Sequence, residues 1–170
     1  MRILVIGIMI SCLAIISCNN EPKQVTMSDI KELEDELFNS SMSIPNPEKA
    51  QTLVNMYIDY ANNNPQDTIS PNLLFKAADI SMNFRAPVKS IALFNRIINE
   101  YPDYKNVHTA MFLKGFVYED QLKDFSNARK SYMEFLDRYP NSDFADDARV
   151  SLQHLGKSPE ELIKEFENNN

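Results

Sequence analysis

Apolar residues recur three and four positions apart along most of the chain, in stretches separated by prolines and short polar runs. This spacing places the apolar side chains on one face of a helix, so it predicts amphipathic helices. In chain order, the predicted helices span residues 28–39, 48–63, 70–83, 87–100, 106–121, 124–138, 143–155 and 158–167. Glycine, which tight turns between strands require, occurs only three times. The sequence therefore predicts an all-α fold of about seven or eight helices.

Several predicted helices begin with a start signal. The signal is either a side chain that can cap the first turn or a proline at the first helical position. Such signals occur at Ser70-Pro71, Pro87, Asp124, Asp143 and Ser158-Pro159. Glu160 and Glu161 follow the last of these, where acidic residues favour a helix start.

The chain also repeats itself. Asn64-Pro65, Tyr101-Pro102 and Tyr139-Pro140 recur at spacings of 37 and 38 residues. Residues 73–110, laid over 111–148 without a gap, pair side chains of the same class. The matched pairs are Leu74 with Phe112, Lys76 with Lys114, Ala77 with Gly115, Ile80 with Tyr118, Ser90 with Ala128, Phe94 with Tyr132, Ile98 with Leu136, and Ala110 with Ala148. Each unit then holds two helices, and partial units stand at both ends, where a stack of repeats needs a more polar cover.

These positions resemble the tetratricopeptide repeat. The family's two small positions match Ala77/Gly115 and Ser90/Ala128, its aromatic positions match Ile80/Tyr118 and Phe94/Tyr132, and its final proline matches Pro102/Pro140. Two departures are the absence of tryptophan and a unit longer than the usual ~34 residues. Residues 128–148 in particular are similar to repeats of bacterial lipoproteins such as BamD and CpoB. The resemblance implies a helical-hairpin solenoid over residues 28–167, followed by a polar tail at 168–170.

The first residues look like an export signal. Arg2 precedes an apolar run from Ile3 to Ile16, which is too short to span a bilayer comfortably. Ile15-Ile16-Ser17-Cys18 resembles the lipobox of bacterial lipoproteins, in which a small residue precedes the cysteine that is acylated and exposed by cleavage. Residues 1–17 are then the lipoprotein signal peptide, and 18–27 are the lipidated cysteine and a polar tether. Cys12 as the acceptor, an ordinary signal peptide and an uncleaved anchor helix are the alternatives.

Charge and cysteine content narrow the class further. The whole chain carries a net charge of −7, and loss of Arg2 with the signal leaves 16 basic against 24 acidic residues, or −8. This sign disfavours nucleic-acid partners and electrostatic binding to anionic lipid. Both cysteines lie at or before the proposed cleavage point, so the predicted domain has no thiol chemistry. Asn19 follows Cys18 where an aspartate would imply inner-membrane retention, so we expect an outer-membrane lipoprotein that faces the periplasm.

The sequence offers little chemistry. His108 and His154 stand alone, without a metal-binding spacing, and no glycine-rich phosphate loop is present. Adjacent acids such as Asp146 and Asp147 diverge by about 100° on a helix, so they cannot readily flank one substrate. We therefore expect no catalytic residue, no metal and no cofactor.

The better candidate site is the concave wall of the stack, which the first helix of each unit lines in this family. The positions carried over by the resemblance are Leu74, Ala78, Ser81, Met82, Thr109, Phe112, Phe116, Glu119 and Asp120. Phe112 and Phe116 form an i,i+4 aromatic pair that either anchors a partner or fills the core between repeats. Tyr101, Tyr104, Tyr139 and Phe144 are expected to pack the turns between units.

These features predict a lipid-anchored periplasmic adaptor that binds proteins or peptides of the cell envelope, contacts the membrane through its acyl chains, and takes no nucleic acid or small-molecule cofactor. Envelope or outer-membrane assembly is its expected setting. An enzyme or small-ligand carrier that uses the concave groove is one alternative, and a self-assembling structural lipoprotein is another.

Overall fold

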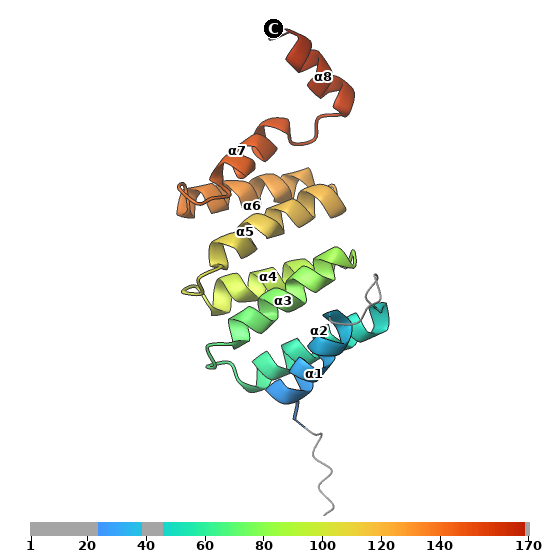
Figure 1. Cartoon of the computed structure of the whole chain (residues 1–170). Helices are drawn as coiled ribbons and strands as arrows, with labels where there is room; N and C mark the ends of the chain where they lie inside the picture. Colours follow the sequence, from blue (N-terminus) through green and yellow to red (C-terminus); the bar gives the residue numbers. More distant parts are fainter. Residues whose placement is uncertain (1–23, 39–45, 169–170) are drawn as a thin grey trace, which may run out of the picture.

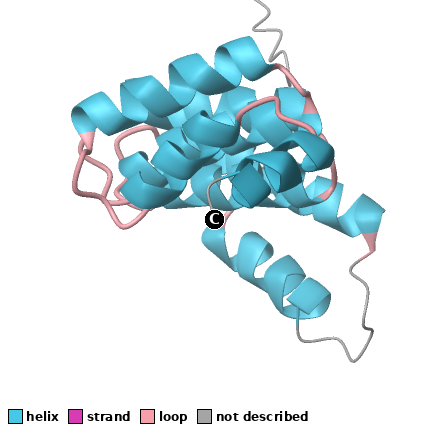
Figure 2. Ribbon diagram, turned by 90° about the horizontal axis from the view of Figure 1, so that it is seen from above, coloured by secondary structure: helices cyan, strands magenta, loops and turns pink. Residues whose placement is uncertain are grey.

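The structure, a computed structural model, describes residues 24–38 and 46–168, and every regular element in those ranges is helical (Figures 1 and 2). The elements are α1 (Met27–Phe38), α2 (Pro47–Asn63), α3 (Ser70–Asn83), α4 (Pro87–Glu100), α5 (Val107–Phe116), the π-helical turn η1 (Val117–Gln121), α6 (Phe125–Arg138), α7 (Ala145–His154) and α8 (Pro159–Asn168). The predicted all-α repeat fold is confirmed. The predicted signal peptide, Cys18 and most of the tether lie outside the described residues.

The helices form a stack in which each hairpin packs on the next (Figure 1). Helix α3 packs against both α2 and α4, and α5 packs against α4 and α6. The fully buried side chains that link the layers include Tyr57 on α2, Phe94 on α4 and Tyr132 on α6. These three residues follow one another at the repeat spacing, so the same position of the second helix supplies the core of each unit. Helix α8 extends away from the stack (Figure 1).

The three connections between units share the same backbone geometry. The second helices end at Asn64, Tyr101 and Tyr139 with φ/ψ values of −133/57°, −133/59° and −135/58°. Each of these residues precedes a proline, which disfavours a further helical residue there. The carbonyl of each then accepts a turn hydrogen bond from the third residue along, at 3.0, 3.0 and 3.2 Å. The repeat inferred from Asn-Pro and Tyr-Pro is thus a repeat of backbone conformation.

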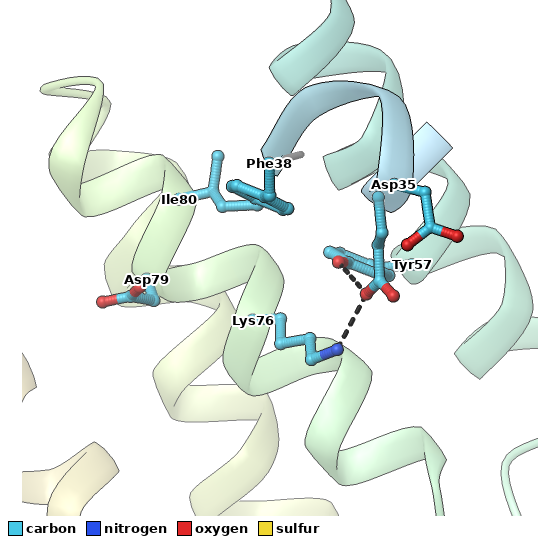
Figure 3. Close-up of a pocket in the computed structure, with 7 residues that line it drawn as sticks. Asp35, Phe38, Tyr57, Lys76, Asp79 and Ile80 are labelled. Carbon is cyan, nitrogen blue, oxygen red and sulfur yellow. Dashed lines mark hydrogen bonds and ion pairs between the residues drawn. The ribbon is translucent and has the colours of Figure 1, made fainter. Parts of the chain in front are cut away.

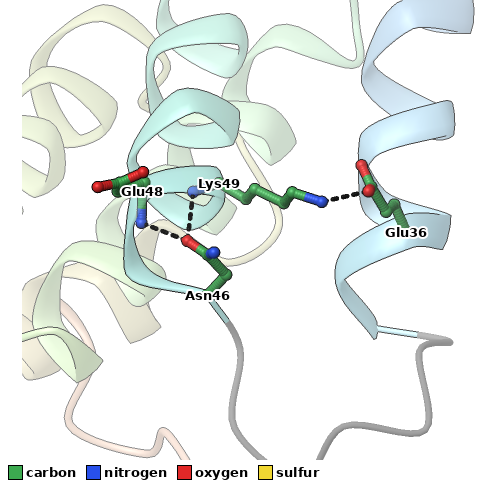
Figure 4. Close-up of polar contacts among 4 residues, drawn as sticks. All are labelled: Glu36, Asn46, Glu48 and Lys49. Carbon is green, nitrogen blue, oxygen red and sulfur yellow. Dashed lines mark hydrogen bonds and ion pairs between the residues drawn. The ribbon is translucent and has the colours of Figure 1, made fainter.

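Polar side chains cap the starts of several helices. Asn46 accepts hydrogen bonds from the backbone N–H groups of Glu48 and Lys49 at 2.9 and 3.2 Å, and Lys49 pairs with Glu36 on α1 (Figure 4). Asp124 caps α6 through the N–H of Asn127, as predicted. Ser158 and Glu161 form a reciprocal capping box on α8, with bonds of 2.7 and 3.2 Å.

Two predicted caps are wrong. Ser70 is the first residue of α3, and its hydroxyl donates instead to the carbonyl of Asn64 at 2.6 Å, which ties the preceding turn. Asp143 does not cap α7, whose N-cap position is Phe144. The backbone N–H of Phe144 donates to the Ser142 hydroxyl at 3.4 Å, so the connector supplies its own short turn there.

The two turns within the repeats contain residues with left-handed backbone. Arg85 has φ 52° and Lys123 has φ 53°, and the two are one repeat apart. Arg85 is the residue after the C-cap of α3, and the next N–H, from Ala86, bonds back to the carbonyl of Ser81 at 2.8 Å. Glycine is the usual residue at this position, because a Cβ is strained in left-handed backbone.

Replacing Lys123 by glycine should therefore stabilise the fold by up to about 1 kcal/mol, since the strain of a left-handed non-glycine residue is of order 1–2 kcal/mol and glycine returns part of it as chain entropy. Urea unfolding of the mature protein measures the change. The matched control is Lys130→Gly within α6, which should destabilise by about 1 kcal/mol. Equal effects of the two substitutions would show that the turn is not strained.

Candidate partner-binding groove

A pocket of about 410 Å³ lies between α1 and α3 (Figure 3). It belongs to the first helices of two successive units, which share one side of the stack, and its lining includes a side chain of the second helix, Tyr57. The lining residues are Glu34, Asp35, Phe38, Tyr57, Lys76, Asp79 and Ile80.

Glu34 ties the three helices together. Its carboxylate accepts a hydrogen bond from the Tyr57 hydroxyl on α2 and another, at 2.7 Å, from the Lys76 ammonium on α3 (Figure 3). Burial alone would raise the pKa of Glu34, but the bonds from Lys76 and Tyr57 outweigh it and lower that pKa. Burial, followed by the bond to Glu34, raises the pKa of the Tyr57 hydroxyl. Glu34 is therefore an ionised carboxylate that links three helices, and it does not act as a proton donor at neutral pH.

The rest of the pocket combines an apolar rim with acidic walls. Phe38 is 59% exposed at the end of α1, and Ile80 lies opposite on α3 (Figure 3). Asp35 and Asp79 add two carboxylates, and burial raises the pKa of Asp79 although a hydrogen bond with Asn83 opposes the change. Among the described residues of the lining, Lys76 is the single basic side chain. This arrangement offers apolar contact next to a surplus of negative charge.

The α3 positions carried over from the repeat family lie mostly inside the core. Leu74 and Ala78 are 0% exposed, and Ser81 is 3% exposed with its hydroxyl donating to the carbonyl of Ala77 at 2.7 Å. Met82 is half-buried. Because α3 packs against both α2 and α4, the buried face of the helix is wide and includes Leu74, Ala78 and Ser81. Leu74, Ala78 and Ser81 are thereby removed from any accessible wall.

The α5 and η1 positions divide between core and surface. Phe112 stacks on Phe144, with ring centroids 4.9 Å apart and planes at 13°, and also contacts Tyr132 and Phe135. It packs into the core between repeats but is only half-buried, and Phe116, 39% exposed, is the more exposed residue of the predicted aromatic pair. Thr109 is half-buried.

The two predicted acids next to this segment already have partners. Glu119 accepts a hydrogen bond from the Tyr132 hydroxyl at 2.7 Å, and Asp120 lies 3.7 Å from the ammonium of Lys123. The structure thus does not gather the predicted residues into one site. Their role in partner binding stays a prediction for Phe116 and its half-buried neighbours.

None of the residues that line the pocket is among the groove positions that the family resemblance predicts. A signal was present in the sequence: Lys76, Asp79 and Asn83 recur every three or four residues opposite the apolar stripe of α3, which marks that helix's outer side. The predicted packing role of the turn aromatics is confirmed. Phe144 stacks as described, Tyr139 lies against Phe135, and Tyr104 lies against Phe75.

Within residues 24–38 and 46–168, no group of three or more histidine, cysteine, aspartate or glutamate side chains is arranged to hold a metal ion. The helices of the same residues are also too short or too polar to cross a membrane. His108 lies in the first turn of α5, where its Nδ1 is 3.2 Å from the hydroxyl of Ser142 in the next connector and its ring contacts Tyr139.

Comparison with known proteins gives one result. The model of a protein family described as "YfiO: Outer membrane lipoprotein" matches residues 81–158, just under half of the chain. No curated protein matches the chain. The matched segment runs from the end of α3 to the start of α8, and it includes the second full repeat with both Tyr-Pro connectors. Over these residues the chain is similar to the YfiO family of outer membrane lipoproteins, which confirms the predicted resemblance to repeat-containing bacterial lipoproteins.

Proposed function

We propose that the protein is a lipid-anchored adaptor on the periplasmic side of the outer membrane, which holds a partner protein against the side of its stack formed by α1, α3 and α5. Acyl chains on Cys18 supply the anchor in this proposal. The similarity to an outer membrane lipoprotein family supports the location, and the stacked helical hairpins support protein binding, since such stacks expose extended surfaces to partners.

The observation that carries the proposal is the apolar rim of the α1–α3 pocket. Phe38 is 59% exposed, although its helix buries Ile30 and Leu37 completely or almost completely. An exposed aromatic beside a 410 Å³ cavity is a suitable anchor point for one apolar side chain of a bound segment. The carboxylates of Asp35 and Asp79, on the two helices that flank the pocket, favour a partner segment that carries lysine or arginine.

The same residues do not favour catalysis. A general acid at neutral pH needs a carboxyl whose pKa is raised towards 7, whereas two hydrogen bonds lower the pKa of Glu34. Asp79 has a raised pKa, but its hydrogen-bond partner is the neighbouring Asn83 on the same helix. Binding without chemistry is the function that this geometry supports.

The test compares the unmodified protein with single-residue variants, each full-length, tagged and purified in mild detergent from the envelope of its own bacterium. Phe38→Ala should lower recovery of a specific envelope protein by about 5- to 30-fold, because truncation of an anchor residue typically costs about 1–2 kcal/mol of binding energy. Phe116→Ala tests the α5 wall in the same way.

Met133→Ala is the matched control, since Met133 is also 59% exposed but lies on α6, a second helix. It should leave recovery unchanged. If every protein recovered with the unmodified chain is retained equally by Phe38→Ala, Phe116→Ala and Met133→Ala, the groove is not the binding surface.

A further inference from the structure

Exposed apolar side chains gather at the turns that join the two helices of each repeat. Phe84 and Val88 flank the α3–α4 turn with 43% and 75% exposure, and Leu122 and Phe125 flank the η1–α6 turn with 39% and 40%. Phe84 and Leu122 are one repeat apart, so the same turn position projects an apolar side chain twice.

These two turns lie along one edge of the stack. The Gln121 amide donates to the carbonyl of Met82 at 2.9 Å, which joins the end of η1 to the end of α3. In Figure 1 both turns lie on the same side, and the connectors at 64–70, 101–107 and 139–145 lie on the opposite side. We call this side the turn edge, defined by Phe84, Arg85, Val88, Lys89, Leu122, Lys123 and Phe125.

Basic side chains alternate with the apolar ones on the turn edge. Arg85 and Lys123 occupy the left-handed positions where glycine is usual, immediately after Phe84 and Leu122. Arg85 and Lys89 form no ion pair with any residue in the described part of the chain, and Lys123 has a weak one, 3.7 Å from Asp120. The carboxylate of Asp124 is occupied by the backbone N–H and side-chain amide of Asn127. Together with Asp120 and Asp124, which flank it, the turn edge carries three basic and two acidic side chains, so its local charge is slightly positive although the whole chain carries −7.

We propose that the turn edge rests on a phospholipid surface, with Phe84, Val88, Leu122 and Phe125 at the boundary of headgroups and acyl chains and with Arg85 and Lys89 against lipid phosphates. Apolar side chains next to basic ones are the chemistry that binds a membrane interface. A bilayer deforms around protruding turn tips, whereas a partner helix requires a groove to receive it.

This inference rests on the proposed lipid anchoring in one respect. Acyl chains would hold the domain close to the bilayer, so a weak second contact becomes effective at high local concentration. It does not depend on a protein partner, because vesicles of purified lipid contain none. Phe38→Ala should therefore leave docking of the turn edge intact even if it abolishes partner recovery.

The experiment places a polarity-sensitive thiol probe on the lipidated, mature protein in vesicles of phosphatidylethanolamine and phosphatidylglycerol. Both native cysteines lie at or before position 18, so one introduced cysteine in the domain is labelled selectively. The probe at Val88→Cys should shift to shorter wavelength and be quenched by brominated lipid, and the probe at Met133→Cys should remain in water. Adding Arg85→Gln and Lys89→Gln should lower the docked-to-undocked ratio about 25-fold, at roughly 1 kcal/mol for each cation.

Equal emission and equal quenching at the two positions would overturn the proposal. So would a shift at position 88 that appears only when envelope proteins are added, since the occupant would then be a protein. An unchanged ratio in the Arg85→Gln/Lys89→Gln variant would show that lipid phosphates are not recognised there, and would overturn it too.

Discussion

Replacing Tyr132 by alanine is expected to lower the free energy of unfolding by about 3–5 kcal/mol, the usual range for truncation of a buried aromatic residue. Tyr132 is 0% exposed, its ring lies 5.8 Å from that of Phe112, and it also lies against Gly115. The substitution therefore removes the packing between α5 and α6 at its centre. Urea unfolding of the mature chain, followed by helical circular dichroism, measures the loss.

The control for this prediction separates packing from hydrogen bonding. Tyr132→Phe keeps the ring and removes only the hydroxyl that donates to Glu119, so it should cost about 1 kcal/mol. A loss of less than about 1 kcal/mol for Tyr132→Ala would contradict the assignment of Tyr132 to the central packing of its unit, because a buried aromatic cannot be removed so cheaply.

The position of Tyr132 holds a buried aromatic residue in each unit. Tyr57 and Tyr132 both donate a hydroxyl hydrogen bond to a glutamate of the first helix, Glu34 and Glu119 respectively. The middle unit has Phe94 at this position, and Ser81, one repeat before Glu119, replaces the acid. The middle unit thus lacks both the hydroxyl and the acid, and a buried hydroxyl without an acceptor would be destabilising there.

The architecture was predictable because it depends on features that act locally. Proline after Asn64, Tyr101 and Tyr139 ends the second helices, and small residues such as Ala77 and Ser90 permit close helix contact. These signals gave the helix order and the repeat, and the observed ends of α3, α4 and α6 lie within about one residue of those predicted.

The candidate groove was harder to predict because accessibility depends on neighbours. The exposure of Leu74 or Ala78 is decided by α2 and α4, which pack on either side of α3. The left-handed residues Arg85 and Lys123 gave no sequence signal, since neither is glycine or asparagine. The π-helical turn η1 was likewise read as ordinary helix, because an i to i+5 bond such as that from Leu122 to Val117 changes no periodicity that a short segment could show.

Replacing Gly115 by leucine is expected to destabilise the fold by at least about 2 kcal/mol, because the new side chain would enter space that Tyr132 fills. A Cβ at position 115 would lie 2.7 Å from both Cδ1 and Cε1 of that ring. Helix propensity works in the opposite direction, since leucine is favoured over glycine by about 1 kcal/mol. The equivalent residue, Ala77, has a Cβ and is fully buried, so the unit that contains Phe94 does not require a glycine at this position.

The effects of Gly115→Leu and Tyr132→Ala on the free energy of unfolding should be strongly coupled. This coupling tests the contact without depending on the size of either single effect. In the Tyr132→Ala background the ring is gone, so Gly115→Leu should add helix propensity and fill part of the cavity. The double variant is then expected to be more stable than Tyr132→Ala alone, with a coupling energy of about 3 kcal/mol, at the upper end for residues in contact. Additive losses in the urea midpoints of the single and double variants would mean that Gly115 is small for a reason other than its contact with Tyr132.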